Sequence, residues 1–139
     1  MTDEAAGIPL VSVVIPMYQA EAWIADTLAS VAAQTHPRVE TIVVDDGSSD
    51  RGADLVSVFC GSAERSVRLF RTTNNGVAAA RNLGIAESNG VYVALLDADD
   101  LWHPTKLESQ VAQLERSGSP MCVCGYEFFD DRTRRRIGV

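Results

Sequence analysis

Apolar segments alternate with amphipathic segments along this chain. Runs rich in β-branched apolar residues predict four strands, at 10–16, 39–44, 67–71 and 91–96. Apolar residues spaced three or four apart predict helices between and after these runs, at about 21–35, 52–59, 77–88 and 104–117. Strands that alternate with helices are typical of a parallel sheet with right-handed crossovers. The predicted fold class is therefore α/β, with a mostly parallel central sheet.

The stretch VYVALLDADDLW at 91–102 carries the most information about function. Six apolar residues end abruptly in three acids, Asp97, Asp99 and Asp100. The apolar part predicts a buried parallel strand, and the acids fall just past its carboxyl end, where such sheets bind ligands. Asp97 and Asp99 are two residues apart, so extended backbone directs both to one side. Such a pair can hold a divalent cation that shares its ligands with a phosphate; the simpler alternative is a solvated loop with a helix cap.

Polar residues also follow the first two predicted strands. In a doubly wound sheet the first and fourth strands lie side by side where the strand order reverses, and the crevice there is the binding site. If this chain follows that order, Tyr18, Asp46 and Asp97 converge at one edge of the sheet. A phenolic ring and several acids would suit a base, ribose hydroxyls and a metal-bound phosphate.

Composition narrows the function classes. The 139 residues, 46% of them hydrophobic, indicate one globular domain. A net charge of −7 argues against nucleic acid as the main partner. Residues 1–9 lack the basic-then-apolar pattern of a signal peptide, from which we expect a cytoplasmic location. Three cysteines without a C-x-x-C pair predict buried free thiols rather than a zinc site or a disulfide.

The predicted domain spans 10–129 and includes a fifth strand at 121–129. Residues 1–9 are predicted to be an N-terminal tail and 130–139 a charged C-terminal tail. The basic part of that tail, 132–136, could contact an anionic membrane surface, but we favour a solvated terminus. An open sheet edge would be free to pair with another copy of the chain, so a homo-oligomer is a further expectation.

Several common nucleotide-binding and metal-binding motifs do not fit. No G-x-x-x-x-G-K-[ST] occurs, which excludes a P-loop, and no G-x-G-x-x-G follows the first strand. Trp102 stands where an EF-hand starting at Asp97 would require glycine.

Four ordered motifs instead resemble the family 2 glycosyltransferases of the GT-A fold. They are VSVVIPMYQAE at 11–21, VVDDGSSD at 43–50, NNGVAAARNLGI at 74–85 and LLDADDLWHPTKLE at 95–108. The resemblance covers about 10–129 and departs at Gln19, where the family usually has Asn.

The resemblance implies a site for a nucleotide-diphosphate sugar, with a UDP-sugar as the expected donor. Carried over by position, it places residues around the base (Pro16, Tyr18 and Asp46), on the pocket wall (Glu21 and Arg81), near the ribose (Asp97) and on a Mg²⁺ or Mn²⁺ ion (Asp99). Considered by themselves, Tyr18 could be a core aromatic and Arg81 an ion-pair partner along its helix.

The reaction that the resemblance implies is inverting transfer of the sugar to a saccharide or lipid-linked acceptor. In the family, the general base lies in the acceptor-binding half, and no catalytic residue is identified here. The late acids Glu127, Asp130 and Asp131 lie at the end of the fifth strand or directly after it, too early in the chain for that role. We therefore expect the donor half of a larger enzyme, truncated after the fifth strand, or a shortened relative. The alternatives are a non-catalytic nucleotide-sugar-binding module and a phosphatase of the haloacid dehalogenase type, which also ends a strand in D-x-D.

Overall fold

The computed structural model describes residues 7–61 and 66–138. These residues form two compact units, of which the larger ends at Leu107 and the smaller begins at Glu108. No helix in the described ranges has the length and apolar character needed to cross a membrane.

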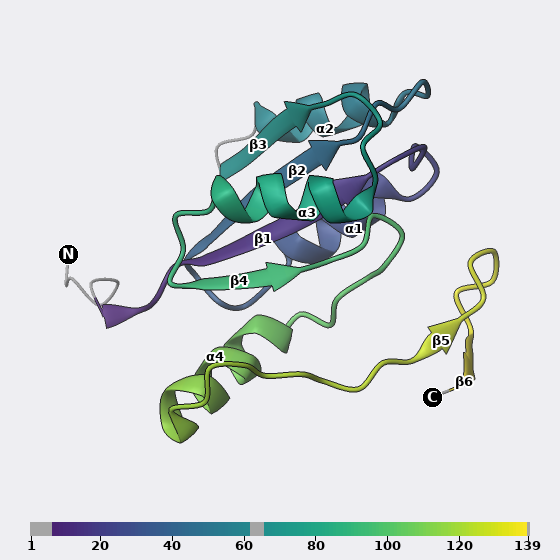
Figure 1. Ribbon diagram of the computed structural model, residues 1–139. Coiled ribbons are helices and arrows are strands. Elements are labelled where there is room, and N and C mark those ends of the chain that lie inside the picture. Colours follow the sequence, from purple (N-terminus) through teal and green to yellow (C-terminus); the bar gives the residue numbers. More distant parts are fainter. Residues whose placement is uncertain (1–6, 62–65, 139) are drawn as a thin grey trace. The chain divides into compact units, whose positions relative to one another are not determined.

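A parallel four-stranded sheet forms the centre of the larger unit (Figure 1). Its strands are β1 (Val11–Met17), β2 (Val39–Asp45), β3 (Ser66–Arg71) and β4 (Tyr92–Leu95), in the order β3-β2-β1-β4. Every residue of β1 and β2 is buried. The strand order reverses between β1 and β4, as predicted, so a binding crevice is expected at the carboxyl ends of these two strands.

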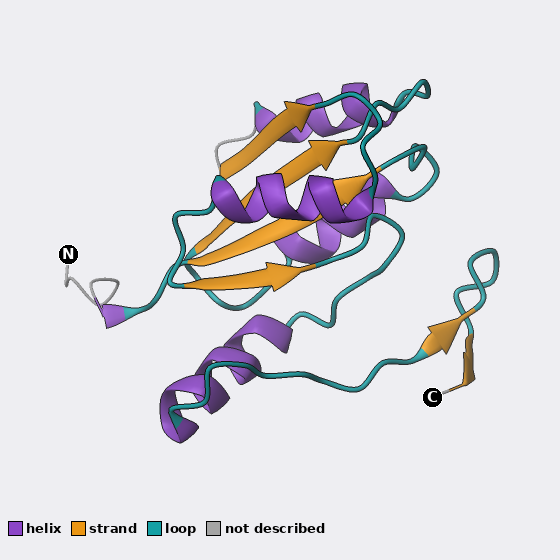
Figure 2. Ribbon diagram, in the orientation of Figure 1, coloured by secondary structure: helices purple, strands orange, loops and turns teal. Residues whose placement is uncertain are grey.

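Helices cover both faces of this sheet (Figure 2). Helices α1 (Ile24–Ala32) and α2 (Gly52–Cys60) lie on one face, and α3 (Val77–Ala86) lies on the other. The predicted apolar stripe of α1 is confirmed, because Ile24, Leu28 and Val31 are all buried. The α/β fold predicted from the alternating pattern is therefore confirmed.

Helix α3 packs very closely on β1. A Cβ atom added to Gly84 would lie 2.3 Å from Cγ1 of Val14, well inside van der Waals contact. Only a residue without a side chain allows this approach. The small residue at this position therefore lets α3 lie close to the sheet.

Strand β4 is less buried than predicted. Its residues alternate between half-buried and exposed, and Val93 and Leu95 are 42% and 50% exposed. The reason is that β4 is at the edge of the four-stranded sheet, whereas α3 packs over β1 and β2. The cysteines also differ from the prediction: they are free thiols, but Cys60 and Cys124 are exposed.

Helix α4 (Lys106–Ser117) follows the acidic stretch. Leu107 and Val111 of its predicted apolar stripe are buried. The helix stops before Gly118, whose φ of +67° lies in the left-handed region that glycine adopts without strain.

The predicted fifth strand at 121–129 is wrong in its extent. Only β5 (Phe128–Phe129) is a strand, and it pairs antiparallel with β6 (Arg136–Gly138), inside the predicted C-terminal tail. Between them, Thr133 N donates to the Asp130 carboxylate at 2.7 Å and closes a turn. A strand is held by backbone hydrogen bonds to a neighbouring strand. Within the described residues the segment 121–127 has no such partner, so it does not form a strand.

Candidate functional site

A pocket of about 230 Å³ lies at the carboxyl ends of β1 and β4. Its walls come from the end of β1, the turn that leads into α1, one side of α3 and the loop after β4. The lining residues are Pro16, Tyr18, Ala20, Trp23, Val77, Arg81, Asp97, Ala98 and Asp99. Five of the seven predicted site residues are therefore brought together in one pocket: Pro16, Tyr18, Arg81, Asp97 and Asp99.

Two aromatic side chains border this pocket. Tyr18 is 55% exposed, which rules out the alternative of a core aromatic, and Trp23 is 38% exposed. Their apolar ring faces suit a planar or ring-shaped ligand. Trp23 was not predicted as a site residue. The sequence signal that could have found it is its place directly before the buried stripe of α1, at the end of the turn that carries Tyr18.

An ion pair crosses the pocket from α3 to the loop after β4. The guanidinium of Arg81 lies 2.7 Å from Oδ1 of Asp97. Arg81 thus has an ion-pair partner on another element rather than along its own helix. Both side chains are partly exposed, so the pair contributes little to the free energy of unfolding. Its effect is to orient the two groups inside the pocket.

The acidic stretch concentrates negative charge at the pocket. Desolvation raises the pKa of Asp100, and the neighbouring charges of Asp99 and Asp97 raise it further. No hydrogen bond or ion pair to the exposed Asp99 carboxylate is found among the described residues. Asp99 is exposed and lines the pocket, so its carboxylate is available to an incoming cation.

The chemistry of these donors fits a hard divalent cation. In the part of the chain that the structure describes, no three His, Cys, Asp or Glu side chains converge into a complete metal cage. Mg²⁺ is commonly bound by only one or two carboxylates, together with substrate phosphates and water. Asp99, with Asp97 two residues away, supplies that minimal set of carboxylate oxygens.

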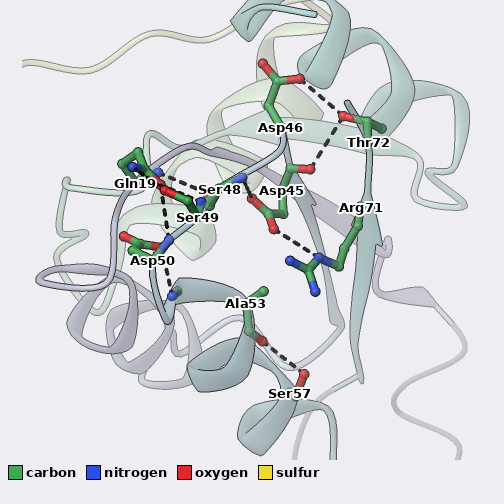
Figure 3. Close-up of polar contacts among 11 residues, drawn as sticks. Gln19, Asp45, Asp46, Ser48, Ser49, Asp50, Ala53, Ser57, Arg71 and Thr72 are labelled. Atoms are coloured by element: carbon green, nitrogen blue, oxygen red, sulfur yellow. Dashed lines mark hydrogen bonds and ion pairs between the residues drawn. The ribbon is translucent and has the colours of Figure 1, made fainter. Parts of the chain in front are cut away.

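Asp46 is not among the pocket-lining residues. It is buried after the end of β2. Its carboxylate accepts a hydrogen bond from Thr72 Oγ1 at 3.2 Å (Figure 3), and it also accepts hydrogen bonds from Asn75 N and Gly76 N, both at 2.8 Å. The hydrogen bond from Asn75 N is the main cause that lowers the pKa of Asp46, and those from Gly76 and Thr72 add to it. The carboxylate thus holds the loop that leads into α3.

Gln19 fastens the loop after β1 to the loop after β2 (Figure 3). Its amide oxygen accepts hydrogen bonds from Ser49 N at 2.7 Å and Asp50 N at 3.2 Å, and its own N–H donates to Ser48 Oγ at 3.0 Å. Gln19 adopts a φ of +52°, which is uncommon for a residue other than glycine. The bonds that Gln19 makes hold this conformation next to Tyr18.

Glu21 belongs to the same pair of loops and does not line the pocket. Its carboxylate accepts a hydrogen bond from Arg51 N at 2.8 Å, while its own N–H donates to the Asp50 carboxylate at 2.9 Å. The two loops therefore hold each other by reciprocal bonds between acids and backbone amides. Glu21 and Gln19 position the wall of the pocket that carries Tyr18.

Comparison with solved structures identifies the fold class. The S. aureus protein TarS (residues 1–349, in complex with UDP) superposes with a TM-score of 0.73 at 27% identity, over 78% of this chain and 33% of that one. The mannosyltransferase PcManGT from Pyrobaculum calidifontis, in complex with GDP-Man and Mn²⁺, gives a TM-score of 0.73 at 29% identity, with coverages of 78% and 33%. The larger unit therefore has the GT-A fold of glycosyltransferases.

The sequence comparisons identify the family. The model of glycosyl transferase family 2 matches residues 12–138. The putative teichuronic acid biosynthesis glycosyltransferase TuaG of Bacillus subtilis is 41% identical over 86% of this chain and 46% of its own length. An uncharacterized glycosyltransferase of Rickettsia felis is 38% identical over 88% of this chain and 20% of its own length. The chain belongs to glycosyl transferase family 2, and it spans less than half the length of these two relatives.

Proposed function

We propose that this chain binds the nucleoside-diphosphate sugar donor of a glycosyl transfer reaction, in the pocket at the ends of β1 and β4. One observation carries the proposal: an exposed aromatic ring, a guanidinium and two acids of the D-x-D sequence line the same pocket, from Tyr18, Arg81, Asp97 and Asp99. The ring offers a face to a base, and the guanidinium suits a phosphate. Asp97 can accept a hydrogen bond from a ribose hydroxyl.

The proposed donor is a UDP-sugar, and the proposed metal is Mn²⁺ or Mg²⁺ on Asp99. TarS in complex with UDP and with UDP-GlcNAc supports a uridine nucleotide, and PcManGT in complex with GDP-Man and Mn²⁺ supports a divalent ion. A bound divalent cation would neutralise negative charge that grows on the departing diphosphate. In this proposal the cation binds at the acids that line the pocket, Asp97 and Asp99.

The proposed reaction is inverting transfer to an acceptor hydroxyl. The acceptor oxygen forms a bond to the anomeric carbon, the bond from that carbon to the diphosphate oxygen breaks, and the nucleoside diphosphate leaves. A general base takes the proton of the acceptor, a role that we assign to no residue of this chain. The chain's own residues bind and orient the donor: Tyr18 and Trp23 along the rings, and Arg81 with Asp97 across the pocket.

Calorimetric titration of the chain with UDP and with GDP, each with and without Mn²⁺, tests this function. We expect UDP to bind with Mn²⁺ present, to bind more weakly after chelation of the metal, and to bind more tightly than GDP. Tighter binding of GDP would overturn the uridine assignment. Absence of binding by both nucleotides would overturn the proposed donor site.

The Asp99→Ala variant tests the metal ligand. Removal of the carboxylate should abolish metal-dependent UDP binding, because the ion loses the pocket-lining acid that we propose as its ligand. The matched control is Asp54→Ala, which removes an exposed acid of α2 outside the pocket and should leave UDP binding unchanged. Metal-dependent affinity that is equal in Asp99→Ala and wild type would show that the ion binds elsewhere.

A further inference from the structure

Polar residues along one side of α1 contact the stretch that carries the D-x-D acids. Thr27 and Ser30 belong to α1, and Gln34 lies just beyond the end of the helix. Thr27 and Gln34 are buried, 0% and 3% exposed. Each of these three residues forms a hydrogen bond with a residue in the range 98–107, about seventy positions further along the chain.

Thr27 contacts the backbone on both sides of Asp99. Its Oγ1 lies 2.9 Å from the carbonyl oxygen of Ala98 and 2.9 Å from that of Asp100. A hydroxyl has one proton, so the two carbonyls share it. Burial of a hydroxyl is unfavourable unless it is hydrogen-bonded, so these two carbonyls account for threonine at this fully buried position.

Further bonds hold the backbone before and after this point. Leu96 N donates to Val14 O at 3.0 Å, and Asp100 N donates back to Asp97 O at 3.1 Å. On the other side, Trp102 N donates to Ser30 Oγ at 3.2 Å.

Gln34 completes the attachment with both ends of its amide. Its nitrogen donates to His103 O at 2.8 Å, and its oxygen accepts from Leu107 N at 3.0 Å. The backbone around the acids is therefore tied to β1 and α1, while the Asp99 carboxylate is exposed at the pocket.

This attachment opposes an electrostatic force. Asp97, Asp99 and Asp100 are three like charges within four residues, and they repel one another at neutral pH. This repulsion favours separation of the acids and opening of the turn at 97–100. The hydrogen bond that Thr27 shares between the carbonyls of Ala98 and Asp100 opposes this opening.

We propose that Thr27 is a positioning residue for Asp99: its buried hydroxyl fixes the two carbonyls that flank Asp99 and so presets the carboxylate for a divalent cation and the diphosphate it carries. The inference rests on the proposed donor site, because it assigns Thr27 a role in the same site. Thr27 is not among the residues that line the pocket. Its effect is transmitted through the backbone of residues 98–100.

Three variants separate positioning from stability. Thr27→Val keeps the shape and removes the hydroxyl, and Thr27→Ser keeps the hydroxyl. The control Thr41→Val removes the hydroxyl of another buried threonine, in β2, whose side chain makes no hydrogen bond to 97–107 in the described structure. The measurements are Mn²⁺ affinity by electron paramagnetic resonance, hydrogen exchange of the amides at 97–103 without metal, and the unfolding midpoint in urea.

We expect Thr27→Val to weaken Mn²⁺ binding by about tenfold or more, in the range found when groups supporting metal ligands are removed. Amide exchange at 97–103 should become faster in this variant. Thr27→Ser should restore both properties, and Thr41→Val should change neither, even where its unfolding midpoint falls as far as that of Thr27→Val.

Two results would overturn the inference: wild-type Mn²⁺ affinity and exchange in Thr27→Val, or equal losses in Thr27→Val and Thr41→Val. Failure of the proposed function gives a different result, namely no Mn²⁺ or UDP binding by the wild-type chain. In that event, faster amide hydrogen exchange at 97–103 in Thr27→Val alone would support the claim that the Thr27 hydroxyl holds this backbone. Unchanged exchange would refute that claim. If Thr27→Val does not fold, Thr27→Ser decides the matter, because loss of Mn²⁺ affinity in this folded variant would contradict the role of the hydroxyl.

Discussion

At the scale of single residues, the acids at the strand ends differ in what their carboxylates contact. Asp46 accepts hydrogen bonds from backbone amides, Asp97 pairs with Arg81, and Asp99 is exposed at the pocket. The sequence predicts that such acids gather at one edge of the sheet, because parallel strands share the direction of their carboxyl ends. It does not predict which carboxylate the backbone of a distant loop will engage.

The Asp46→Asn variant tests the structural role of this carboxylate. An asparagine amide directs N–H groups at backbone donors, so at least one of the bonds from Asn75 and Gly76 is lost. We expect the free energy of unfolding to fall by about 1.5–3 kcal/mol, the usual contribution of a hydrogen bond to a charged group. Urea denaturation at pH 7 measures it, with the exposed Asp54→Asn as control.

The same variant tests the prediction that Asp46 contacts the base. A loss of UDP affinity in folded Asp46→Asn, with Mn²⁺ affinity kept, would support that contact. Equal unfolding free energies in Asp46→Asn and Asp54→Asn would contradict the structural role.

At the scale of elements, local patterns predict what depends on local chemistry. The apolar stripe of α1 and the strand run of β1 depend on residues close in sequence, and the structure confirms both. The exposure of Val93 depends instead on whether another layer covers β4, which no local pattern contains. The same reason applies to 121–129, where a strand needs a partner to pair with.

The polar side of α1 was also missed, although its spacing was visible. Thr27, Ser30 and Gln34 recur at i, i+3 and i+7, the same spacing that reveals an apolar stripe. A polar stripe beside an apolar one is ordinary for an amphipathic helix, so the spacing alone does not predict hydrogen bonds to a distant loop.

Gly84→Ala tests the close packing of α3. Helix propensity alone predicts that alanine stabilises a helix by about 1 kcal/mol relative to glycine. The added methyl would instead overlap Cγ1 of Val14, a side chain with little rotamer freedom, so we expect a net loss of about 1–3 kcal/mol from overpacking. UDP affinity should fall as well, because α3 carries Val77 and Arg81 into the pocket. A more stable variant with unchanged UDP affinity would contradict this close contact.

At the scale of the whole molecule, buried carboxylates hold the sheet at both ends. Asp46 follows β2 at the carboxyl end. At the other end, Glu40 accepts hydrogen bonds from Ser12 Oγ at 2.6 Å and Asn89 N at 2.7 Å, and pairs with Arg68 at 3.3 Å. Burial by itself raises the pKa of Glu40, but the hydrogen bonds from Ser12 and Asn89, with the charge of Arg68, outweigh it and lower the pKa. Each carboxylate is therefore bound more strongly in its ionised form.

These two lowered pKa values predict that acid weakens the fold. A carboxylate whose pKa is lower in the folded chain contributes stability that is complete above its ordinary pKa, 4.5 for Glu40 and 3.8 for Asp46, and is lost as the pH falls through the folded value. The contribution of Asp100 to stability changes with pH in the opposite direction. Its pKa is raised in the folded chain, so its charge opposes folding at neutral pH, and this penalty disappears in acid. We expect Glu40 and Asp46, whose pKa values are lowered, to dominate the change in stability below pH 4.5, since each loses about 1.5–3 kcal/mol of charged hydrogen bonds.

Urea denaturation of the wild type and of the Glu40→Gln/Asp46→Asn double variant, from pH 7 to pH 3, measures the difference. The double variant should be less stable at pH 7 and should lose less stability on acidification; parallel pH profiles would locate the acid sensitivity in other groups.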